Sequence, residues 1–322
     1  MPSRREISTL PGMTADATAR ERALALPILA AAVVALSSAA ILIRMSDAPA
    51  LSTAFFRVLF SAAMLAPFAL RDRTRGATVP WRQHAGFTVA AGAALGMHFF
   101  VWMRSLDLTS VASSTLFVTT TPIWVALASR WLPGEDPPTL KGWMGLGVSI
   151  VGGGVIIAGT AGPSAEGVTL AGIAYATLGA WLAAAYLIAS RGLRHHVPLG
   201  TLTFRTNAVA ALTLGLLVLL TGAPVLGWDA TTWGVLLAMA ALPQLVGHNA
   251  LIWGLKYFGA TVIALVVLLE PIGASLLAAV CFSEFPCLWE WIGGGLLLAG
   301  LALAVRSAND DAPADPATHC ST

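Results

Sequence analysis

Charged residues are scarce in this sequence. Of its 322 residues, 11% are Asp, Glu, Lys or Arg and 57% are hydrophobic, whereas about 25% are charged in soluble domains. A soluble protein of this size needs a polar shell, and too few polar residues are present to form one. The net charge of +2 is also too small to favour nucleic acid. These shortages exclude a soluble enzyme, a nucleic-acid-binding protein and a disordered chain, and they indicate that the bilayer is the solvent.

Cysteines and phosphate-binding motifs are also lacking. Cys281, Cys287 and Cys320 are too few for a disulfide framework and are expected to be isolated thiols. The glycine triplets 152–154 and 293–295 are not phosphate loops, because no P-loop lysine follows them. They predict small-residue faces for close helix packing. No ligand cluster for a metal is visible, and we expect neither a metal site nor a cofactor.

Long runs of apolar residues make up most of the sequence. A helix needs about 20 mostly apolar residues to cross about 30 Å of hydrocarbon. Ten such runs occur, at 26–43, 50–70, 83–103, 109–131, 141–159, 168–190, 199–221, 231–254, 260–282 and 288–305. The first run also has the features of a signal peptide. It is long enough to span, however, and the repeat described below requires ten spans, so we interpret it as an uncleaved helix.

The distribution of Lys and Arg predicts the orientation of the chain. With the N-terminus in the cytoplasm, 14 of the 18 basic residues fall in cytoplasmic segments. Only Arg44 and Arg104 fall in outside loops, and Arg57 and Arg205 fall within spans. Positive residues concentrate on the cytoplasmic side of membrane proteins. We therefore expect both polar tails, 1–25 and 307–322, to be cytoplasmic.

The two halves of the chain resemble each other. Several pairs recur at an offset of 148 or 149 residues: Phe56-Arg57 with Phe204-Arg205, Pro122 with Pro271, Glu135 with Glu284, and Gly145 with Gly294. This predicts one repeat at 26–159 and another at 168–306. Because each half holds five spans, the second half must enter the membrane from the opposite side. Inverted repeats around a midplane site are typical of secondary transporters.

The same segments carry a resemblance to a known family. They are Leu106–Ser114 with Thr121-Pro122, Leu132–Glu135, Gly247–Asn249, Gly259–Pro271 and Ser283-Glu284. Over about 26–306 the chain resembles the EamA family of the drug/metabolite transporter superfamily. The resemblance implies an all-α integral membrane protein with ten transmembrane helices, in two inverted five-helix repeats around a central cavity. It also implies movement of small metabolites, and it favours export.

Ionisable residues within spans are costly and are candidate functional residues. Counted from the span ends, Arg57 and His98 share the outer third of the membrane, and Arg205 and His248 share the inner third. Each pair is a candidate gate region. The two arginines are alternatively structural, binding loops or carbonyls and extending toward the interface.

Glu270 is the one acidic residue that we place within a span, near the midplane and directly before Pro271. A buried carboxylate there suits binding of a proton or a substrate amine. The alternative is a structural ion pair with Arg205, or a hydrogen bond to His248 or Asn249. Pro122 and Pro271 are expected to kink their helices and free a backbone carbonyl.

Other polar and aromatic residues complete the candidate site. His98 and His248 are either polar packing residues or proton relays. Thr121 is expected to line the pore or to bond a backbone carbonyl. Trp124 and Trp181 lie deep within spans, where they either line an aromatic cavity or pack between helices.

Taken together, these features predict a secondary-active transporter of small organic metabolites such as amino acids, amines or drugs. Alternating access, by exchange or by proton coupling, is the expected mechanism, in a bacterial cytoplasmic membrane, as a monomer or homodimer. An intramembrane serine hydrolase, suggested by Gly273–Ser275 with His248, leaves the repeat unexplained. A receptor that does not transport would need a large soluble domain or long loops, and neither is visible. Substrate identity and coupling ion are not encoded in any motif.

Overall fold

The computed structural model describes residues 15–76, 79–129, 139–160, 168–194, 196–254 and 266–310, and it is helical throughout these ranges, with no strand in them. The helices of the first half are α1 (Ala15–Arg44), α2 (Ala50–Thr74), α3 (Trp81–Leu106), α4 (Val111–Val118), α5 (Thr121–Ser129) and α6 (Leu140–Thr160). Those of the second half are α7 (Leu170–Arg194), α8 (Leu199–Thr221), α9 (Ala230–Met239), the π-helix η1 (Ala240–His248), α10 (Asn249–Gly254), α12 (Glu270–Phe282) and α13 (Leu288–Asp310).

Seven of the described helical segments are long and apolar enough to cross a membrane, where the sequence predicts ten spans. Three further apolar helices are shorter, at Val111–Val125, Glu270–Phe282 and Leu288–Ala304. They fall within the fourth, ninth and tenth predicted spans. The ninth span is only partly described, because residues 255–265 lie outside the described ranges. The chain is thus an all-α protein with multiple apolar helices.

Prolines and polar caps set where the helices begin. Pro49, Pro80 and Pro198 precede α2, α3 and α8, with φ of −56°, −57° and −55°. A proline fits there because its φ is preset and the first helical N–H groups have no intrahelical acceptor. Ser110 caps α4 by accepting a hydrogen bond from the backbone N–H of Ser113. Gly222 ends α8 in the left-handed conformation, at φ 68°.

Three of the predicted spans are not continuous α-helices in their described residues. In the ninth, a turn at residues 268–269 comes directly before α12. The fourth is interrupted at Thr119 and Thr120, between α4 and α5. The eighth changes from α9 into the π-helix η1, which contains Pro243. Proline removes a backbone donor from the helical ladder, and π-helical turns take up such defects. In the fourth span, the interruption lies directly before Thr121-Pro122, where a kink is predicted from the sequence.

The first and last helices extend beyond their predicted spans. α1 begins at Ala15 and α13 continues to Asp310, so parts of the predicted tails 1–25 and 307–322 are helical. The sequence at 15–25 is rich in Ala, Arg and Glu, which favour helix. Residues 1–14 and 311–322 lie outside the described ranges.

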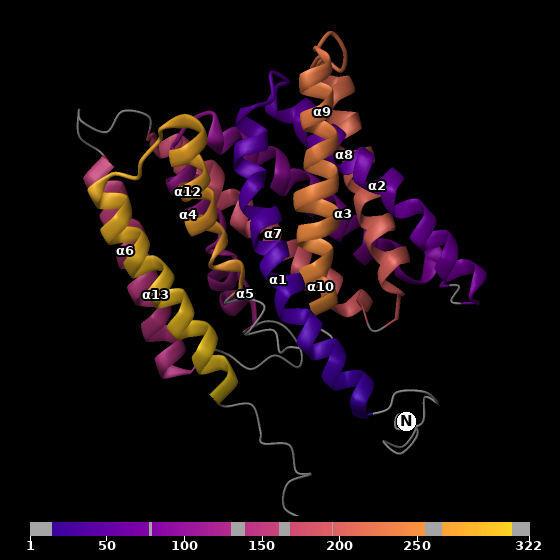
Figure 1. Ribbon diagram of the computed structural model, residues 1–322, viewed down its shortest axis with the longest axis horizontal. Coiled ribbons are helices and arrows are strands. Elements are labelled where there is room, and N and C mark those ends of the chain that lie inside the picture. Colours follow the sequence, from indigo (N-terminus) through magenta and orange to yellow (C-terminus); the bar gives the residue numbers. More distant parts are fainter. Residues whose placement is uncertain are drawn as a thin grey trace, which may run out of the picture.

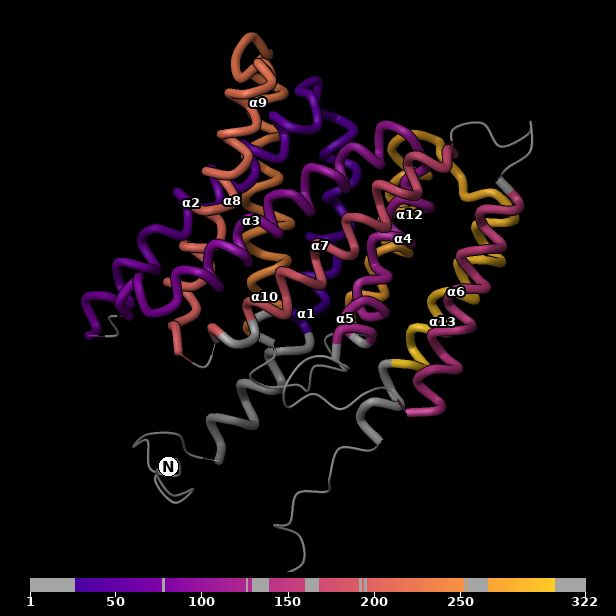
Figure 2. The backbone as a smooth tube through the Cα atoms, turned by 180° about the vertical axis from the view of Figure 1, so that it is seen from behind, coloured from indigo at the N-terminus to yellow at the C-terminus, as the bar shows by residue number. Residues whose placement is uncertain are grey.

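Helices of one half pack mainly on helices of the other. α2 packs on α8, α3 on α7 and α8, and α1 on η1 and α12. The main core lies among α1, α2, α3, α8 and α9. α6 and α13 form a pair at one edge of the bundle (Figures 1 and 2). A Cβ atom added to Gly152 would lie 2.5 Å from the carbonyl oxygen of Gly293, so the predicted close packing at these glycines is confirmed.

The first helices of the two halves run in opposite directions. At the end of α1, Arg44 Nη2 donates to the carbonyl oxygen of Thr109 at 2.8 Å. Just before α7, Thr169 Oγ1 donates to the carbonyl oxygen of Leu108 at 2.7 Å. The C-terminal end of α1 and the N-terminal end of α7 therefore meet the same connection, between α3 and α4.

The second helices of the two halves are also antiparallel. Near the end of α2, Asp72 Oδ2 accepts from the backbone N–H of Thr201, at the start of α8, at 2.8 Å. Near the start of α2, Ser52 Oγ donates to the carbonyl oxygen of Pro224, past the end of α8, at 2.6 Å. Contacts at both ends thus hold α2 and α8 side by side in opposite directions.

Candidate functional site

A buried guanidinium lies in the middle of the packed helices. Arg57, on α2, is 0% exposed. Its Nη2 donates to Oε1 of Gln244 on η1 at 3.1 Å, and its guanidinium carbon lies 3.9 Å from the centre of the Phe99 ring on α3. Among the residues that the structure describes, its Nε and Nη1 have no hydrogen-bond partner. In this part of the chain, the cation is therefore buried without a directly bound anion.

The contacts of Arg57 compensate its burial only in part. Removing an ion from water costs several kcal/mol in real proteins even after relaxation. A hydrogen bond to a charged group returns about 1.5–3 kcal/mol, and a desolvated cation–π contact returns about 2 kcal/mol. Unsatisfied donors on a buried charge add a further cost. The arrangement thus leaves Arg57 able to accept an anion.

A chain of amides holds the partner of Arg57 in place. Gln244 Nε2 donates to Asn207 Oδ1 on α8 at 3.4 Å, and Asn207 Nδ2 donates to the carbonyl oxygen of Thr203 at 2.9 Å. Gln244 and Asn207 are 4% and 2% exposed. Because its own amide group is held in this way, Gln244 presents its oxygen to Arg57 in one orientation.

Both candidate histidines lie near Arg57. The Phe99 ring that the guanidinium faces also lies beside both histidines, with ring centres 4.9 Å from His98 and 5.8 Å from His248. His98 Nδ1 bonds to the carbonyl oxygen of Gly179 at 2.8 Å, and His248 Nδ1 bonds to that of Pro243 at 2.9 Å. Carbonyl oxygens only accept, so each Nδ1 carries a proton.

Glu270 is the first residue of α12. It is partly exposed. Within the described ranges, the carboxylate makes neither an ion pair nor a hydrogen bond; the backbone oxygen of Glu270 accepts from Ser37 Oγ at 3.4 Å. The ion pair with Arg205 and the hydrogen bonds to His248 or Asn249, which the sequence left open as alternatives, are therefore not among the contacts of the described residues.

Thr121 and Pro122 begin α5 directly after the interruption. Pro122 has no N–H for the carbonyl of Val118, and Thr121 Oγ1 donates to that carbonyl instead, at 3.0 Å. Thr121 Oγ1 also lies 3.4 Å from the carbonyl oxygen of Ala180 on α7. Thr121 thus satisfies the carbonyl that the proline frees and connects α5 to α7.

The two deep tryptophans contact each other. Trp124 and Trp181 pack edge to face, with ring centres 5.1 Å apart and planes at 83°. Trp124 Nε1 donates to Thr120 Oγ1 at 3.3 Å, and Trp181 is 55% exposed. Asn249, at the start of α10, is half-buried.

Arg205 lies in a different setting from Arg57. Its Nη2 donates to the carbonyl oxygen of Val79 at 2.7 Å, and its guanidinium faces the Trp81 ring at 5.6 Å. It lines an open, mainly apolar groove with Trp81 and Leu212. The two arginines, equivalent in the sequence repeat, therefore differ in burial and partners, and His248 lies with Arg57 instead of Arg205.

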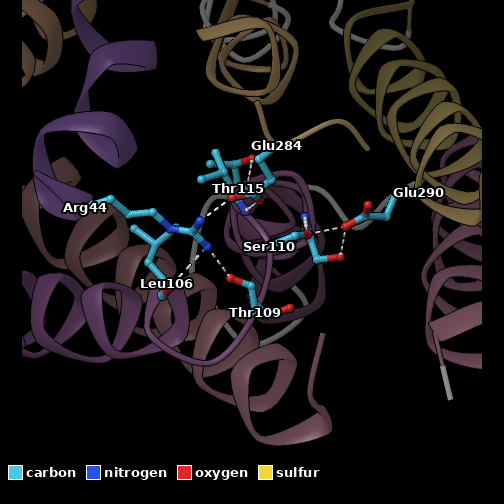
Figure 3. Close-up of polar contacts among 9 residues, drawn as sticks. Arg44, Leu106, Thr109, Ser110, Thr115, Glu284 and Glu290 are labelled. Carbon is cyan, nitrogen blue, oxygen red and sulfur yellow. Dashed lines mark hydrogen bonds and ion pairs between the residues drawn. The ribbon is translucent and has the colours of Figure 1, made fainter. Parts of the chain in front are cut away.

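A second polar cluster lies at the end of the bundle where α1 ends (Figure 3). Arg44 forms an ion pair with Glu284, in the connection between α12 and α13. Its Nη2 also donates to the carbonyl oxygens of Leu106 and Thr109, at 3.3 and 2.8 Å. Glu284 Oε1 accepts from the backbone N–H of Val111 at 2.6 Å. These bonds connect α1, the start of α4 and the end of α12.

Glu290, on α13, extends the same cluster. It is 5% exposed, and its Oε1 accepts from the hydroxyls of Ser110 and Ser113, the latter at 2.6 Å. Its Oε2 accepts from the backbone N–H of Cys287 at 2.8 Å. We refer to Arg44, Glu284, Glu290, Ser110 and Ser113 as the Arg44 network. It joins the two halves of the chain at one end of the bundle.

The sequence analysis missed several of these residues. Gln244 and Asn207 were not predicted, although each is an amide within an apolar span. The sequence analysis places Arg44 in an outside loop and uses Glu284 as the repeat equivalent of Glu135, and it predicts no contact for either residue. The recurring spacing of Glu284 behind Pro271 was the available signal for its role.

The fold and site together define a multi-pass helical membrane protein made of two interlocked halves, with charged groups in its interior. The EamA-like transporter family matches the chain twice, over residues 22–158 and 170–306. The chain belongs to this family, which is part of the drug/metabolite transporter superfamily, and is thus a membrane transporter.

Two known proteins are similar over most of the chain. A protein of Archaeoglobus fulgidus named "Uncharacterized transporter" is 24% identical over 273 residues, which cover 85% of this chain and 93% of that protein. A solved structure titled "Crystal structure of protein" superimposes with a TM-score of 0.62 at 21% identity, and covers 89% of this chain and 99% of that one. The similarity to the solved structure shows that the two chains share a fold.

Proposed function

We propose that this protein is a secondary-active exporter of small organic metabolites, such as amino acids, amines or drugs. It works by alternating access in a bacterial cytoplasmic membrane, with both termini in the cytoplasm. Its ten transmembrane helices form two inverted five-helix repeats around a central site. Arg57, His98, His248 and Glu270 belong to that site, and Glu270 binds a proton or the amine of a substrate.

The opposite directions of equivalent helices carry this proposal. α1 and α7 run in opposite directions, and so do α2 and α8. Two halves of one fold in opposite orientations produce two similar gates that face opposite sides of the membrane. A static scaffold or receptor has no need for such a pair of gates.

The Arg44 network supports the outer gate of this mechanism. On the predicted topology, the ends of α1 and α12 face the outside, so the network closes the outer end. It consists of side chains from the ends of helices and from their connections, so it can break while every helix stays intact. Its partly exposed ion pair, with side chains 26% and 23% accessible, is weak enough to break repeatedly.

The position of Glu270 supports its role in coupling. It begins α12, where the positive end of the helix dipole favours a carboxylate, and its carboxylate is unpaired within the described ranges. Protonation would remove the negative charge of Glu270. A proton and a cationic substrate group therefore compete for one carboxylate, which is the minimal requirement for exchange.

Flux in proteoliposomes tests the proposal. Vesicles are loaded with a mixed pool of amino acids and small metabolites, with or without a pH gradient. The variants are Glu270→Gln and, as a matched control, Asp107→Asn, whose carboxylate pairs with Arg104 at an exposed site. We expect gradient-driven loss of a few solutes from wild type and Asp107→Asn, and none from Glu270→Gln.

Other results would change the proposal. Full, pH-dependent flux in Glu270→Gln would remove its coupling role. Movement that ignores the gradient in wild type would leave a transporter without proton coupling. No movement of any solute by wild type would contradict the transport proposal for this pool.

A further inference from the structure

We infer that the groove lined by Arg205 binds one anionic phospholipid from the surrounding bilayer. The phosphate of the lipid lies at the Arg205 guanidinium, and one acyl chain follows α8 toward the middle of the membrane. This inference goes beyond the proposed function, because it concerns the lipid-facing surface of the helices and makes no assumption about the transported solute.

The groove is lined by the first part of α3 and by α8, and it has a volume of about 580 Å³. Its walls are mainly apolar, and Val89, Leu212 and Leu216 are exposed there. Lipid tails are as apolar as leucine side chains, so exposed apolar residues on transmembrane helices face lipid. The groove therefore opens toward the bilayer, and lipid is the molecule at its entrance.

The length of the groove matches one leaflet of a bilayer. Arg205 and Leu216 are eleven residues apart on α8, which corresponds to a rise of about 16 Å. Half of the hydrocarbon thickness of a bilayer is about 15 Å. An acyl chain can therefore extend along the whole groove, whereas a small soluble anion would fill only its polar end.

Arg205 places a positive charge at that polar end. Its Nη2 donates to the carbonyl oxygen of Val79 at 2.7 Å, whereas its Nη1 is buried and has no hydrogen-bond partner among the residues that the structure describes. Arg205 is partly exposed as a whole, and a change of rotamer that turns Nη1 into the groove breaks no hydrogen bond of that nitrogen. A phosphate offers several acceptor oxygens in the geometry that a guanidinium recognises.

Trp81 places this charge at the level of the lipid headgroups. It is the first residue of α3, it is exposed, and the guanidinium carbon of Arg205 lies 5.6 Å from the centre of its ring. Tryptophans at the ends of transmembrane helices concentrate at the membrane–water interface, at the level of the headgroups. The phosphate and the acyl chain of a lipid thus each meet a matching part of the groove.

The charges around this end favour an anionic headgroup over a zwitterionic one. The end of α2 lies against the start of α8, where Asp72 Oδ2 accepts from the backbone N–H of Thr201 at 2.8 Å. Arg71 and Arg73, on either side of Asp72, are exposed. Basic residues at a membrane surface attract anionic lipids, whereas the ammonium of a zwitterionic headgroup would bring a further positive charge to this end.

The equivalent arginine of the other half cannot form such a site. Arg57 is 0% exposed and packs against Phe99 in the interior, so no lipid reaches it. The inferred site is therefore specific to the second half of the chain. On the predicted topology it takes its lipid from the cytoplasmic leaflet.

Thermal unfolding of the purified full-length protein in detergent tests this inference. The additions are phosphatidylglycerol, phosphatidylcholine with the same acyl chains, and inorganic phosphate. The readout is the melting temperature as a function of their concentration, which gives an apparent affinity. In wild type we expect phosphatidylglycerol to bind at least about tenfold more tightly than phosphatidylcholine, and inorganic phosphate to have no effect.

Variants with matched controls assign that preference to the groove. Arg205→Gln should abolish it, whereas Arg73→Gln, which removes an exposed charge at the same end, should keep it. Ala208→Trp fills the groove without changing the charge, so it should weaken phosphatidylglycerol binding at least about tenfold. Val280→Trp, at an exposed site on α12, is its control and should bind as wild type does. The Ala208→Trp pair keeps the test decisive if Arg205→Gln does not fold.

Several results would overturn the inference. They are equal affinity for the two lipids, a preference that survives in Arg205→Gln, an equal loss in Arg73→Gln, undiminished binding in Ala208→Trp, or an equal loss in Val280→Trp. Stabilisation by inorganic phosphate to the same extent as by phosphatidylglycerol would show a simple anion site and would also overturn it. No flux is measured in this experiment, so its failure and the failure of the proposed transport are separate outcomes.

Discussion

At the scale of single residues, the polar groups of this protein fall into two kinds. Some have hydrogen-bond partners for their polar atoms, as Glu290 does: its carboxylate accepts from two serine hydroxyls and a backbone N–H. Others, such as Arg57, are buried with donors that no described residue satisfies. The first kind stabilises the resting structure, and the second kind is available to a ligand. Substitutions should therefore affect stability in one group and binding in the other.

Glu290→Gln should lower the stability of the protein. The Gln side chain has one acceptor oxygen, and its NH₂ group would face donors that Glu290 now satisfies, so we expect a loss of about 1–3 kcal/mol. Thermal or denaturant unfolding in detergent measures it, with the exposed Asp107→Asn as control. A melting temperature within error of wild type would contradict this role for Glu290.

The cap of α9 should make stability depend on acid pH. The backbone N–H of Thr232 donates to Asp229 Oδ1 at 2.8 Å and, with other hydrogen bonds, lowers the pKa of this carboxyl below its ordinary 3.8. Because the folded pKa is the lower one, the stabilisation is fully present above the unfolded pKa and is lost as pH falls through the folded value. Melting temperatures from pH 6 to pH 3 should fall less for Asp229→Asn than for wild type. Parallel curves would show that Asp229 does not contribute.

At the scale of elements, the interrupted helices are the most informative features. α5 begins at Thr121-Pro122 and α12 begins at Glu270-Pro271, at equivalent places in the two halves. At the first, the Thr121 hydroxyl donates a hydrogen bond to the carbonyl oxygen of Val118, which Pro122 leaves without a backbone donor. Such interruptions are tolerated inside membrane proteins only where the freed groups are satisfied or line a cavity. We interpret them as hinges next to the central site.

Pro122→Ala should impair transport without reducing stability. Alanine restores the N–H that can bond to the carbonyl of Val118 and allows α4 and α5 to join into one helix. We expect the flux to fall at least about tenfold while the melting temperature stays equal or rises. Pro67→Ala, at an exposed proline inside the uninterrupted α2, is the matched control. Normal flux in Pro122→Ala would show that the interruption is not a hinge.

At the scale of the whole molecule, the Arg44 network and the central site belong to one conformational equilibrium. The network joins α1 and α4 of one half to the α12–α13 connection and α13 of the other. Breaking it should shift the population toward a state open to the outside. A bias of about 1 kcal/mol, typical of a partly exposed ion pair, changes such a ratio about fivefold.

Glu284→Gln should therefore expose residues beneath the network. Ser114 is 0% exposed on α4, and its hydroxyl lies 2.6 Å from that of Ser105. In a background with the native cysteines replaced by serine, Ser114→Cys should react with a membrane-impermeant thiol reagent about fivefold faster when Glu284→Gln is present. Met45→Cys, at an exposed site, is the positive control and should react equally in both. Equal rates at position 114 would be evidence against a gate at this end.

The sequence alone determined the class of the protein and its division into halves. Hydropathy, the bias of Lys and Arg and the recurring Phe-Arg, proline and glutamate positions are all local or periodic signals. They are readable because the bilayer imposes a fixed length and polarity on each span. They identified Arg57, His98, His248 and Glu270 as candidates, and the structure brings Arg57, His98 and His248 around the Phe99 ring.

Only the tertiary structure decided how equivalent residues differ. Arg57 and Arg205 are indistinguishable in the repeat, yet one is fully buried beside Phe99 and the other bonds to Val79 at an open groove. The Arg44–Glu284 pair joins residues 240 positions apart, and no local pattern encodes such a contact. The physical reason is that burial and pairing depend on which helices pack together. That packing is set by the shapes of all their faces at once, whereas hydropathy reports each helix separately.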